Sequence, residues 1–199
     1  MTHLALPAPR GMVLGDVIPG DRVRDVALVL AGAALTALGA QIAIHTGASP
    51  VPITGQTLAV VVAGAALGSQ RGMLSQLLYV VVGLFLPVYS DGASGFDVIW
   101  GATGGYLVGF VVAAWIVGRM AEGGADRRFG SATIAFALGQ LSIFAIGVPW
   151  LKVSTGMDWS TAIHDGFTIF IYGGLVKAAL AAIAVPLAWR MVQKADEGA

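Results

Sequence analysis

Long stretches without charged residues alternate with short polar segments along most of the chain. Between Val26 and Gln70 the sequence has no Asp, Glu, Lys or Arg, a length about twice the roughly 20 apolar residues that cross a bilayer as a helix. Two prolines and a glycine between Thr46 and Pro52 cannot continue a helix, so they separate two spans. We expect six membrane-spanning helices, near residues 26–45, 53–69, 72–90, 98–118, 129–151 and 166–192.

Small residues recur at every fourth position of the fourth expected helix. They are Gly101, Gly105, Gly109 and Ala113. This spacing places small side chains on one face, where another helix can approach closely in a membrane. We therefore expect this stripe to pack tightly against another helix inside the bundle, and the sequence leaves open that such a face serves a partner instead.

The composition agrees with a membrane protein. Hydrophobic residues make up 57% of the 199 residues and charged residues only 11%, whereas a soluble domain has about 25% charged residues. Such a chain lacks the polar surface of an ordinary soluble protein, and its abundant apolar residues are the opposite of a disordered composition. We expect an all-α membrane protein in which residues 26–192 form a six-helix bundle, preceded by a segment 1–25 and followed by a tail 193–199.

The basic residues indicate the orientation of the bundle, since Lys and Arg of short loops stay in the cytoplasm. Nine of them fall at the two ends of the chain or in two alternate connections: Arg10, Arg22, Arg24, Arg71, Arg119, Arg127, Arg128, Arg190 and Lys194. This distribution places both termini in the cytoplasm. The connections that then face outward contain Lys152 and four aspartates: Asp91, Asp97, Asp158 and Asp165.

Several classes of function are excluded by what the sequence lacks. Eleven basic and eleven acidic residues give no net charge, so no broad basic field favours nucleic acid. There is no Cys, and the three His residues are too far apart in sequence for a usual zinc motif. Without a Gly-Lys dipeptide the chain has no phosphate-binding loop for ATP. We expect neither a cofactor nor a metal, and energy for any uphill transport must come from another protein.

Lys177 lies deep within the sixth expected helix. It precedes Arg190 by 13 residues, which places it about 20 Å from the inner boundary of the membrane at about 1.5 Å per residue. Inserting a charge at such a place costs on the order of 3 kcal/mol. Two interpretations remain open: the side chain could extend to the outer headgroups, or it could bind an anionic group of a ligand.

Polar side chains also follow the prolines between the first two expected helices, in the sequence PVPITGQT at positions 50–57. Gln56 can donate and accept hydrogen bonds, which suits an amide-like or urea-like ligand, although such groups also join helices to each other. The glycine-rich segment 86–96 is too irregular for a helix. We expect it to form a loop that lines or covers an outward-facing site.

Four segments together are similar to one known family. They are PVPITGQT at 50–57, LPVY at 86–89, TGGYL at 103–107 and KAALAA at 177–182. With these segments the chain resembles, over roughly residues 26–189, the BioY family, the biotin-binding S components of energy-coupling factor (ECF) transporters. The resemblance implies a six-helix fold in the cytoplasmic (inner) membrane of a bacterium and the capture of biotin from the outer side.

The resemblance also implies partners. An S component works with a transmembrane coupling subunit and two cytoplasmic ATPases, which agrees with the missing ATP motif. In this class, small residues of the first helix commonly contact the coupling subunit, and here they are either Ala27 and Ala31 or Ala33 and Ala37. The sequence leaves open whether these partners are obligatory and whether the chain forms a homo-oligomer.

The resemblance and the polar residues together give a ligand-binding hypothesis. Lys177 would pair with the biotin carboxylate or cap the polar end of the ligand, and Thr54 and Gln56 would bind its ureido ring. The further candidates are two loop carboxylates and three aromatic side chains: Asp91, Asp97, Tyr89, Trp100 and Tyr172.

The chain departs from the family pattern at three positions. Gly55 stands where the family commonly has an apolar residue, and Ala102 where it has proline. Gly174 stands where the family usually has an aspartate, which would accept hydrogen bonds from ligand N–H groups. Another acceptor must then serve, and the candidates are the two loop aspartates and Gln56.

A second interpretation is an intramembrane serine protease. Residues 92–95 match the G-x-S-G pattern of rhomboid-type enzymes, with Ser94 as the nucleophile and His164 as its base. Ser94 falls in a glycine-rich loop and His164 precedes the sixth expected helix, so neither lies in the helix that such an enzyme requires. We therefore expect transport rather than an enzyme activity.

Overall fold

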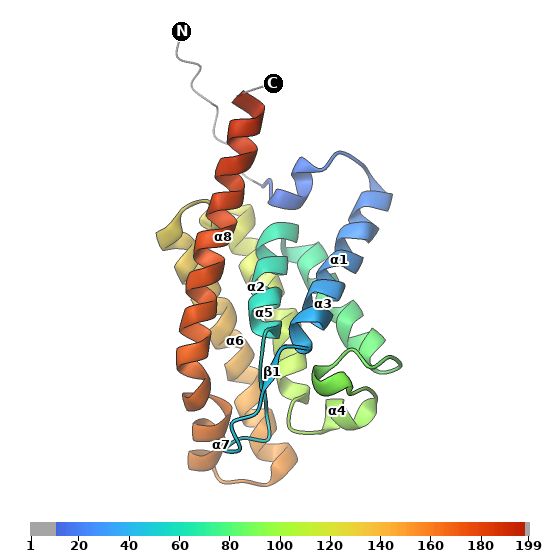
Figure 1. Ribbon diagram of the computed structural model, residues 1–199, viewed down its shortest axis with the longest axis vertical. Helices are drawn as coiled ribbons and strands as arrows, with labels where there is room; N and C mark the ends of the chain where they lie inside the picture. The colour runs from blue at the N-terminus through green and yellow to red at the C-terminus, as the bar shows by residue number, and fades with distance from the viewer. Residues whose placement is uncertain (1–10, 198–199) are drawn as a thin grey trace.

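The computed structural model describes residues 11–197 and is almost entirely helical (Figure 1). Residues 1–10 of the expected leading segment and residues 198–199 of the expected tail lie outside the described residues. The α-helices are α1 (Arg22–Ala40), α2 (Gln56–Leu67), α3 (Ser69–Gly83), α4 (Phe96–Trp100), α5 (Gly104–Glu122), α6 (Phe129–Thr155), α7 (Trp159–Gly166) and α8 (Ile171–Glu197). Short 3₁₀ turns are η1 (Leu14–Val17), η2 (Ser90–Gly92), η3 (Ala125–Arg127) and η4 (Thr168–Phe170).

Four helical stretches of the described residues are long and apolar enough to cross a membrane. They are α1, α5, α6 and Trp159–Ala195, which joins α7 to α8. With 12 and 15 residues, α2 and α3 are about 18 and 22 Å long, less than the roughly 30 Å of a hydrocarbon core. The expected apolar multi-pass bundle is therefore confirmed, whereas the count of six crossings stays a prediction.

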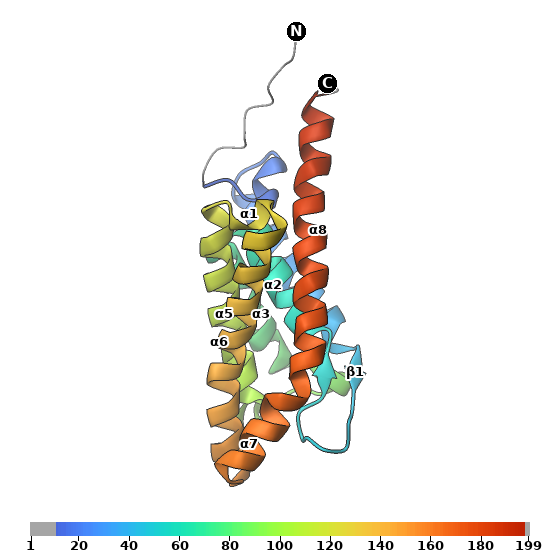
Figure 2. The same ribbon diagram turned by 90° about the vertical axis from the view of Figure 1, so that its left-hand side faces the viewer.

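The first connection contains a short two-stranded ribbon. Strand β1 (Ala43–Ile44) pairs antiparallel with β2 (Ile53–Thr54), so α1 ends at Ala40 instead of the expected 45, and α2 begins at Gln56 instead of 53. Figure 2 shows the ribbon beside the first turns of α8. It lies at the same end of the bundle as α4 and α7 (Figure 1).

The fourth expected helix is divided into α4 and α5. The chain turns so tightly between them that a Cβ atom at Gly104 would overlap the Ile99 carbonyl. The indole N–H of Trp150 donates to the Gly101 carbonyl over 2.9 Å, which anchors this turn to α6. Other boundaries differ by a few residues. The largest differences are that α3 ends at Gly83 instead of 90 and that α8 begins at Ile171 instead of 166, after the turn η4, and ends at Glu197 instead of 192.

Glycines allow the central helices to meet backbone to backbone. A Cβ atom at Gly64 of α2 would lie 2.7 Å from the Ala114 carbonyl oxygen of α5. One at Gly118 of α5 would overlap the backbone of Gly68, where the chain turns from α2 into α3 with a φ of 82°. The Glu122 carboxylate accepts the backbone N–H of Ser69 over 2.7 Å, which holds this turn on α5.

The expected stripe of small residues on α5 faces α6. A Cβ atom at Gly109 would lie 2.9 Å from the Cα atom of Ile143, and one at Gly105 would overlap Trp150. Ala113 is fully buried. The tight packing expected for this helix is therefore confirmed, except that Gly101 lies in the turn before α5.

One face of α1 packs against the bundle and the rest of this helix is exposed. The buried side contains Ala33 and Thr36, whose hydroxyl donates to the Gln76 side chain of α3 over 3.1 Å. Ala37 is partly buried against the core. Of the two alternative alanine pairs, Ala33 and Ala37 therefore face inward, because they share the buried stripe of the helix, whereas Ala27 and Ala31 are exposed.

Candidate functional site

A partly enclosed cavity lies near the end of the bundle that carries β1, β2, α4 and α7. Its volume is about 50 Å³, room for a few water molecules. The walls come from α2, α4, α5, α6 and α8, from β2, η2 and η4, and from the connecting segments. The lining residues are Val51, Pro52, Thr54, Gln56, Thr57, Tyr89, Ser90, Val98, Thr103, Tyr106, Leu107, Phe110, Gln140, Phe144, Phe170, Gly174 and Lys177. Among them only Lys177 carries a formal charge, so the site combines one cation with uncharged polar and apolar side chains.

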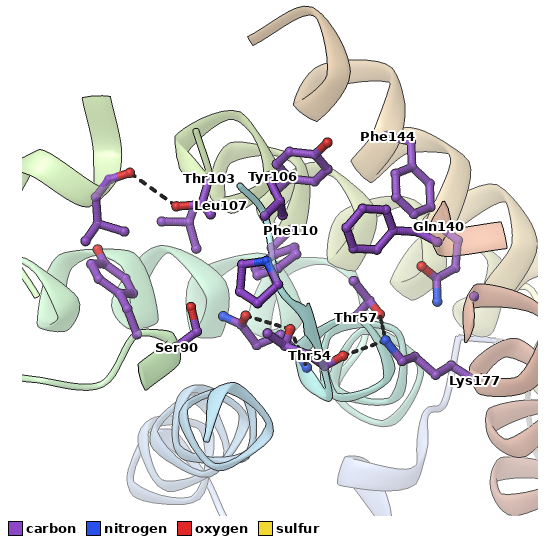
Figure 3. Close-up of a pocket in the computed structure, with 17 residues that line it drawn as sticks. Thr54, Thr57, Ser90, Thr103, Tyr106, Leu107, Phe110, Gln140, Phe144 and Lys177 are labelled. Carbon is purple, nitrogen blue, oxygen red and sulfur yellow. Dashed lines mark hydrogen bonds between the residues drawn. The ribbon is translucent and has the colours of Figure 1, made fainter. Parts of the chain in front are cut away.

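Lys177 extends from α8 into this cavity (Figure 3). Its ammonium donates to the backbone carbonyl of Thr54 and, over 3.1 Å, to the hydroxyl of Thr57. The ion pairs of the described residues include none with Lys177. Since an ammonium has three N–H donors, one remains for a ligand, and the side chain does not extend to the outer surface as one interpretation supposed.

Thr54 and Gln56 hold the segment after the prolines in place. The Thr54 hydroxyl donates to the Gln56 side-chain oxygen over 2.8 Å, and the Gln56 amide N–H donates to the Tyr79 hydroxyl over 2.7 Å. Both polar atoms of the Gln56 amide thus have protein partners. Gln56 lines the cavity as expected, and its hydrogen bonds position the Thr54 carbonyl that faces Lys177.

Tyr89 forms part of the wall in the expected loop. Its hydroxyl donates to the Val80 carbonyl over 2.7 Å, and its ring meets that of Tyr79 edge-on with 5.6 Å between centroids. The ring also lies so close to Gly83 that a Cβ atom there would overlap it. The loop therefore lines the cavity at Tyr89 and Ser90, and its role in ligand binding stays a prediction.

Four residues expected at the site lie outside the cavity wall. The Asp91 carboxylate is exposed and pairs with the His45 ring over 3.1 Å. Asp97 and Trp100 are exposed because the short helix α4 turns Val98 and Ile99 inward. The Trp100 side chain is 68% exposed and stacks on Trp150, with 5.8 Å between the ring centroids.

Tyr172 is the fourth of these residues, and its position follows from helix geometry. It precedes Lys177 by five residues, which turns the two side chains about 140° apart around α8. Tyr172 is accordingly 82% exposed. Gly174 precedes Lys177 by three residues, which places it on the same face, and it lines the cavity.

The walls contain aromatic residues and one amide that the sequence alone did not identify as site residues. Tyr106 donates from its hydroxyl to the Gly166 carbonyl over 2.9 Å, and its ring lies edge-on to that of Phe144. Phe144 also contacts Phe170, with 5.9 Å between the ring centroids. A signal for Gln140 was present, because it is the one amide side chain in the expected helix 129–151.

The protease alternative finds no support in the geometry. Ser94 is an exposed loop residue. The Nδ1 atom of His164, on α7, lies 2.7 Å from the Asp165 carboxylate. No hydrogen bond among the described residues joins Ser94 to His164, so these residues do not form a nucleophile and base pair.

Sequence and structure comparisons point to one family, whose model, described as the BioY family, matches residues 11–194. The biotin transporter BioY2 of Lactococcus lactis subsp. cremoris is 35% identical, over 81% of this chain and 88% of that protein. The probable biotin transporter BioY of Pyrococcus horikoshii is 37% identical, over 81% and 94%. The solved S-component for biotin from an ECF-type ABC transporter has the same fold, with a TM-score of 0.76 and 23% identity over 85% of this chain and 92% of that one. The chain therefore belongs to the BioY family.

Proposed function

We propose that this chain is a biotin-binding S component that takes part in biotin uptake across the membrane. The observation that carries the proposal is the Lys177 ammonium, which faces an otherwise uncharged, aromatic-lined cavity and has one donor left for a ligand. The relatives named as biotin transporters support biotin as that ligand.

The chemistry of biotin matches these walls. Its carboxylate would bind the Lys177 ammonium, or Lys177 would cap the polar end of the ligand, and either contact is strengthened by the low dielectric of the site. The rings of Tyr106, Phe110 and Phe144 provide apolar surface for the bicyclic ring and the tail. A cavity of about 50 Å³ is smaller than this ligand requires, so binding needs the loops at its mouth to move apart.

The proposed membrane arrangement has six crossings, with α2 and α3 as short spans. Arg71 lies near the start of α3, Arg119 in the last turn of α5 and Arg127 in η3. The start of α3 and the end of α5 lie at the end of the bundle where α8 ends, opposite the ribbon (Figure 1). The Arg71 guanidinium binds there to Asp16 and Asp25 over 2.6 and 2.9 Å. Applied to this distribution, the positive-inside rule puts both termini in the cytoplasm of a bacterium and opens the cavity outward.

The proposed partners are an ECF coupling subunit and two cytoplasmic ATPases. Ala27 and Ala31 are exposed on α1, one turn apart, and such small residues permit close contact with another helix in a membrane. We place the contact with the coupling subunit on this face.

Equilibrium binding to the detergent-purified protein tests the proposal. Biotin should bind, and Lys177→Ala should raise its Kd about 10- to 150-fold, since a hydrogen bond to a charged group contributes about 1.5–3 kcal/mol. Lys152→Ala is the matched control, because Lys152 contacts the exposed Trp159 ring and not the cavity. An unchanged Kd for Lys177→Ala would exclude this role, and absence of biotin binding by the wild-type protein would refute the function.

Two analogues identify the group that Lys177 meets. If Lys177 binds the carboxylate, biotin methyl ester should bind weakly to the wild-type protein, and the difference between acid and ester should disappear in Lys177→Ala. Desthiobiotin keeps both the carboxylate and the ureido ring, so it should bind with little loss. An ester that binds the wild-type protein as tightly as biotin would place Lys177 at the other end of the ligand.

A further inference from the structure

Gln140 is a buried amide without a hydrogen-bond partner among the described residues. It lies in the middle of α6, is only 5% exposed, and neither its side-chain oxygen nor its nitrogen is paired. The other buried glutamines differ. Gln56 binds Thr54 and Tyr79, and Gln76 binds Thr36 and Ser75. A buried amide without partners is costly, because it gives up water and gains no hydrogen bond in return.

The Gln140 amide faces the cavity. It forms part of the cavity wall together with Lys177, Thr57 and Gly174. In Figure 3 the amide of Gln140 and the ammonium of Lys177 point toward the same part of this space. Gly174 leaves this side open, since a Cβ atom there would have no neighbour within 4 Å. An incoming ligand group would therefore meet the Gln140 amide without displacing a side chain from α8.

The chemistry of a primary amide selects the group that it binds best. An amide carries an acceptor and a donor side by side. A cyclic urea has an N–H and a carbonyl on the same edge, so the two groups can form two parallel hydrogen bonds. Lys177 offers donors only and cannot accept the urea N–H, and the Gln56 amide already has protein partners.

We propose that Gln140 binds the ureido edge of the ligand through these two hydrogen bonds and thereby determines specificity for a cyclic urea. The proposal rests on the proposed biotin function. It assigns to α6 a recognition role that complements the cation of α8. The ureido group would also give the buried Gln140 amide the hydrogen bonds that it lacks. The site therefore favours a ligand that both donates and accepts hydrogen bonds.

The first test removes the amide. Gln140→Leu keeps the approximate size of the side chain but cannot hydrogen-bond, and we expect the biotin Kd to rise about tenfold to a hundredfold for two lost hydrogen bonds. Gln76→Leu is the control, since Gln76 is also a buried helix residue but lies outside the cavity wall. The biotin Kd of this variant should stay close to the wild-type value. Equal Kd values for Gln140→Leu and the wild type would overturn the inference while leaving the biotin function standing.

The second test changes the selectivity, which a merely structural role would not do. In Gln140→Glu the carboxylate offers acceptors only. This suits 2-iminobiotin, whose cyclic guanidinium is positively charged and presents two N–H donors along one edge. The ratio of the Kd for biotin to the Kd for 2-iminobiotin should rise about tenfold or more over the wild-type ratio. This ratio does not depend on how much of the variant folds. An unchanged ratio would refute the role of Gln140, whereas a wild-type protein that binds neither ligand would refute the biotin function and this inference with it.

Discussion

Replacing Gly174 with aspartate probes the most important departure from the family pattern. Gly174 lines the cavity one helical turn before Lys177. A side chain fits without displacing a neighbour, because a Cβ atom at this position has nothing within 4 Å. Gly174→Asp thus adds one carboxylate to the cavity wall and leaves the packing of α8 unchanged.

The expected magnitude follows from two opposing effects. A carboxylate that accepts a ligand N–H contributes about 1.5–3 kcal/mol, or about 10- to 150-fold in Kd. Against this, the new carboxylate attracts Lys177 with about 4 kcal/mol at 4 Å and an effective dielectric constant of about 20, and this attraction competes with the ligand for both groups. Desolvation of the new charge further reduces the gain. We therefore expect the biotin Kd to stay equal or to fall by as much as about a hundredfold.

Isothermal titration calorimetry with biotin on purified Gly174→Asp measures this change. The matched control is Gly173→Asp, which adds the same charge one residue away, on a face of α8 that does not line the cavity. The control should not tighten binding. A Gly174→Asp protein that folds normally but no longer binds biotin would refute the reasoning, because it would mean that the open space beside Gly174 is not where the ligand N–H groups lie.

Two further predictions concern stability and pH. Gly118→Ala should destabilise the protein by about 1–3 kcal/mol or more, since the new Cβ would overlap the backbone of Gly68 and Ser69. The control Gly130→Ala should not destabilise it, because a Cβ there meets nothing within 4 Å. Thermal unfolding in detergent compares the two variants, and equal melting temperatures would contradict the close packing at Gly118. Burial raises the pKa of the Asp126 carboxyl above 3.8, although the hydrogen bond from the Trp189 indole opposes this. A raised folded-state pKa stabilises the fold below pH 3.8, and this contribution is lost as the pH rises through the raised value. The melting temperature of Asp126→Asn should therefore rise relative to that of the wild type between pH 4 and pH 7. A constant difference in melting temperature across that range would contradict the raised pKa.

The sequence alone predicted the features that depend on solvation and helix breaking. Charge-free stretches located the helical segments because a bilayer tolerates few charges. The cation deep in the last helix singled out Lys177 with two interpretations, and the structure places it in the cavity wall. The prolines at 50 and 52 indicated the break that ends α1 before α2 begins. These effects depend on residues that are close together in the sequence, so they can be predicted without a structure.

The remaining features depend on contacts between distant residues. The division of α4 from α5 results from the close approach of Gly104 to Ile99 and the Trp150 hydrogen bond, which no local pattern indicates. The Gln56 amide is already hydrogen-bonded because Tyr79 lies beside it. That Gln140 is buried without a partner likewise depends on which side chains the other helices place around it. Tyr172 was misplaced for a simpler reason, since its spacing of five from Lys177 already points it away.

The contacts that hold α8 at the cavity differ in kind from those that join α2, α3 and α5. At Gly64 and Gly118 the helices α2, α3 and α5 meet with backbone atoms in direct contact. At the cavity, α8 is joined to the ribbon and α2 by hydrogen bonds from one flexible lysine side chain. A lysine side chain can change rotamer, whereas these backbone contacts have no rotamer to change. A ligand that draws the Lys177 ammonium away from Thr54 and Thr57 would therefore loosen α8 from the ribbon and leave the contacts among α2, α3 and α5 unchanged.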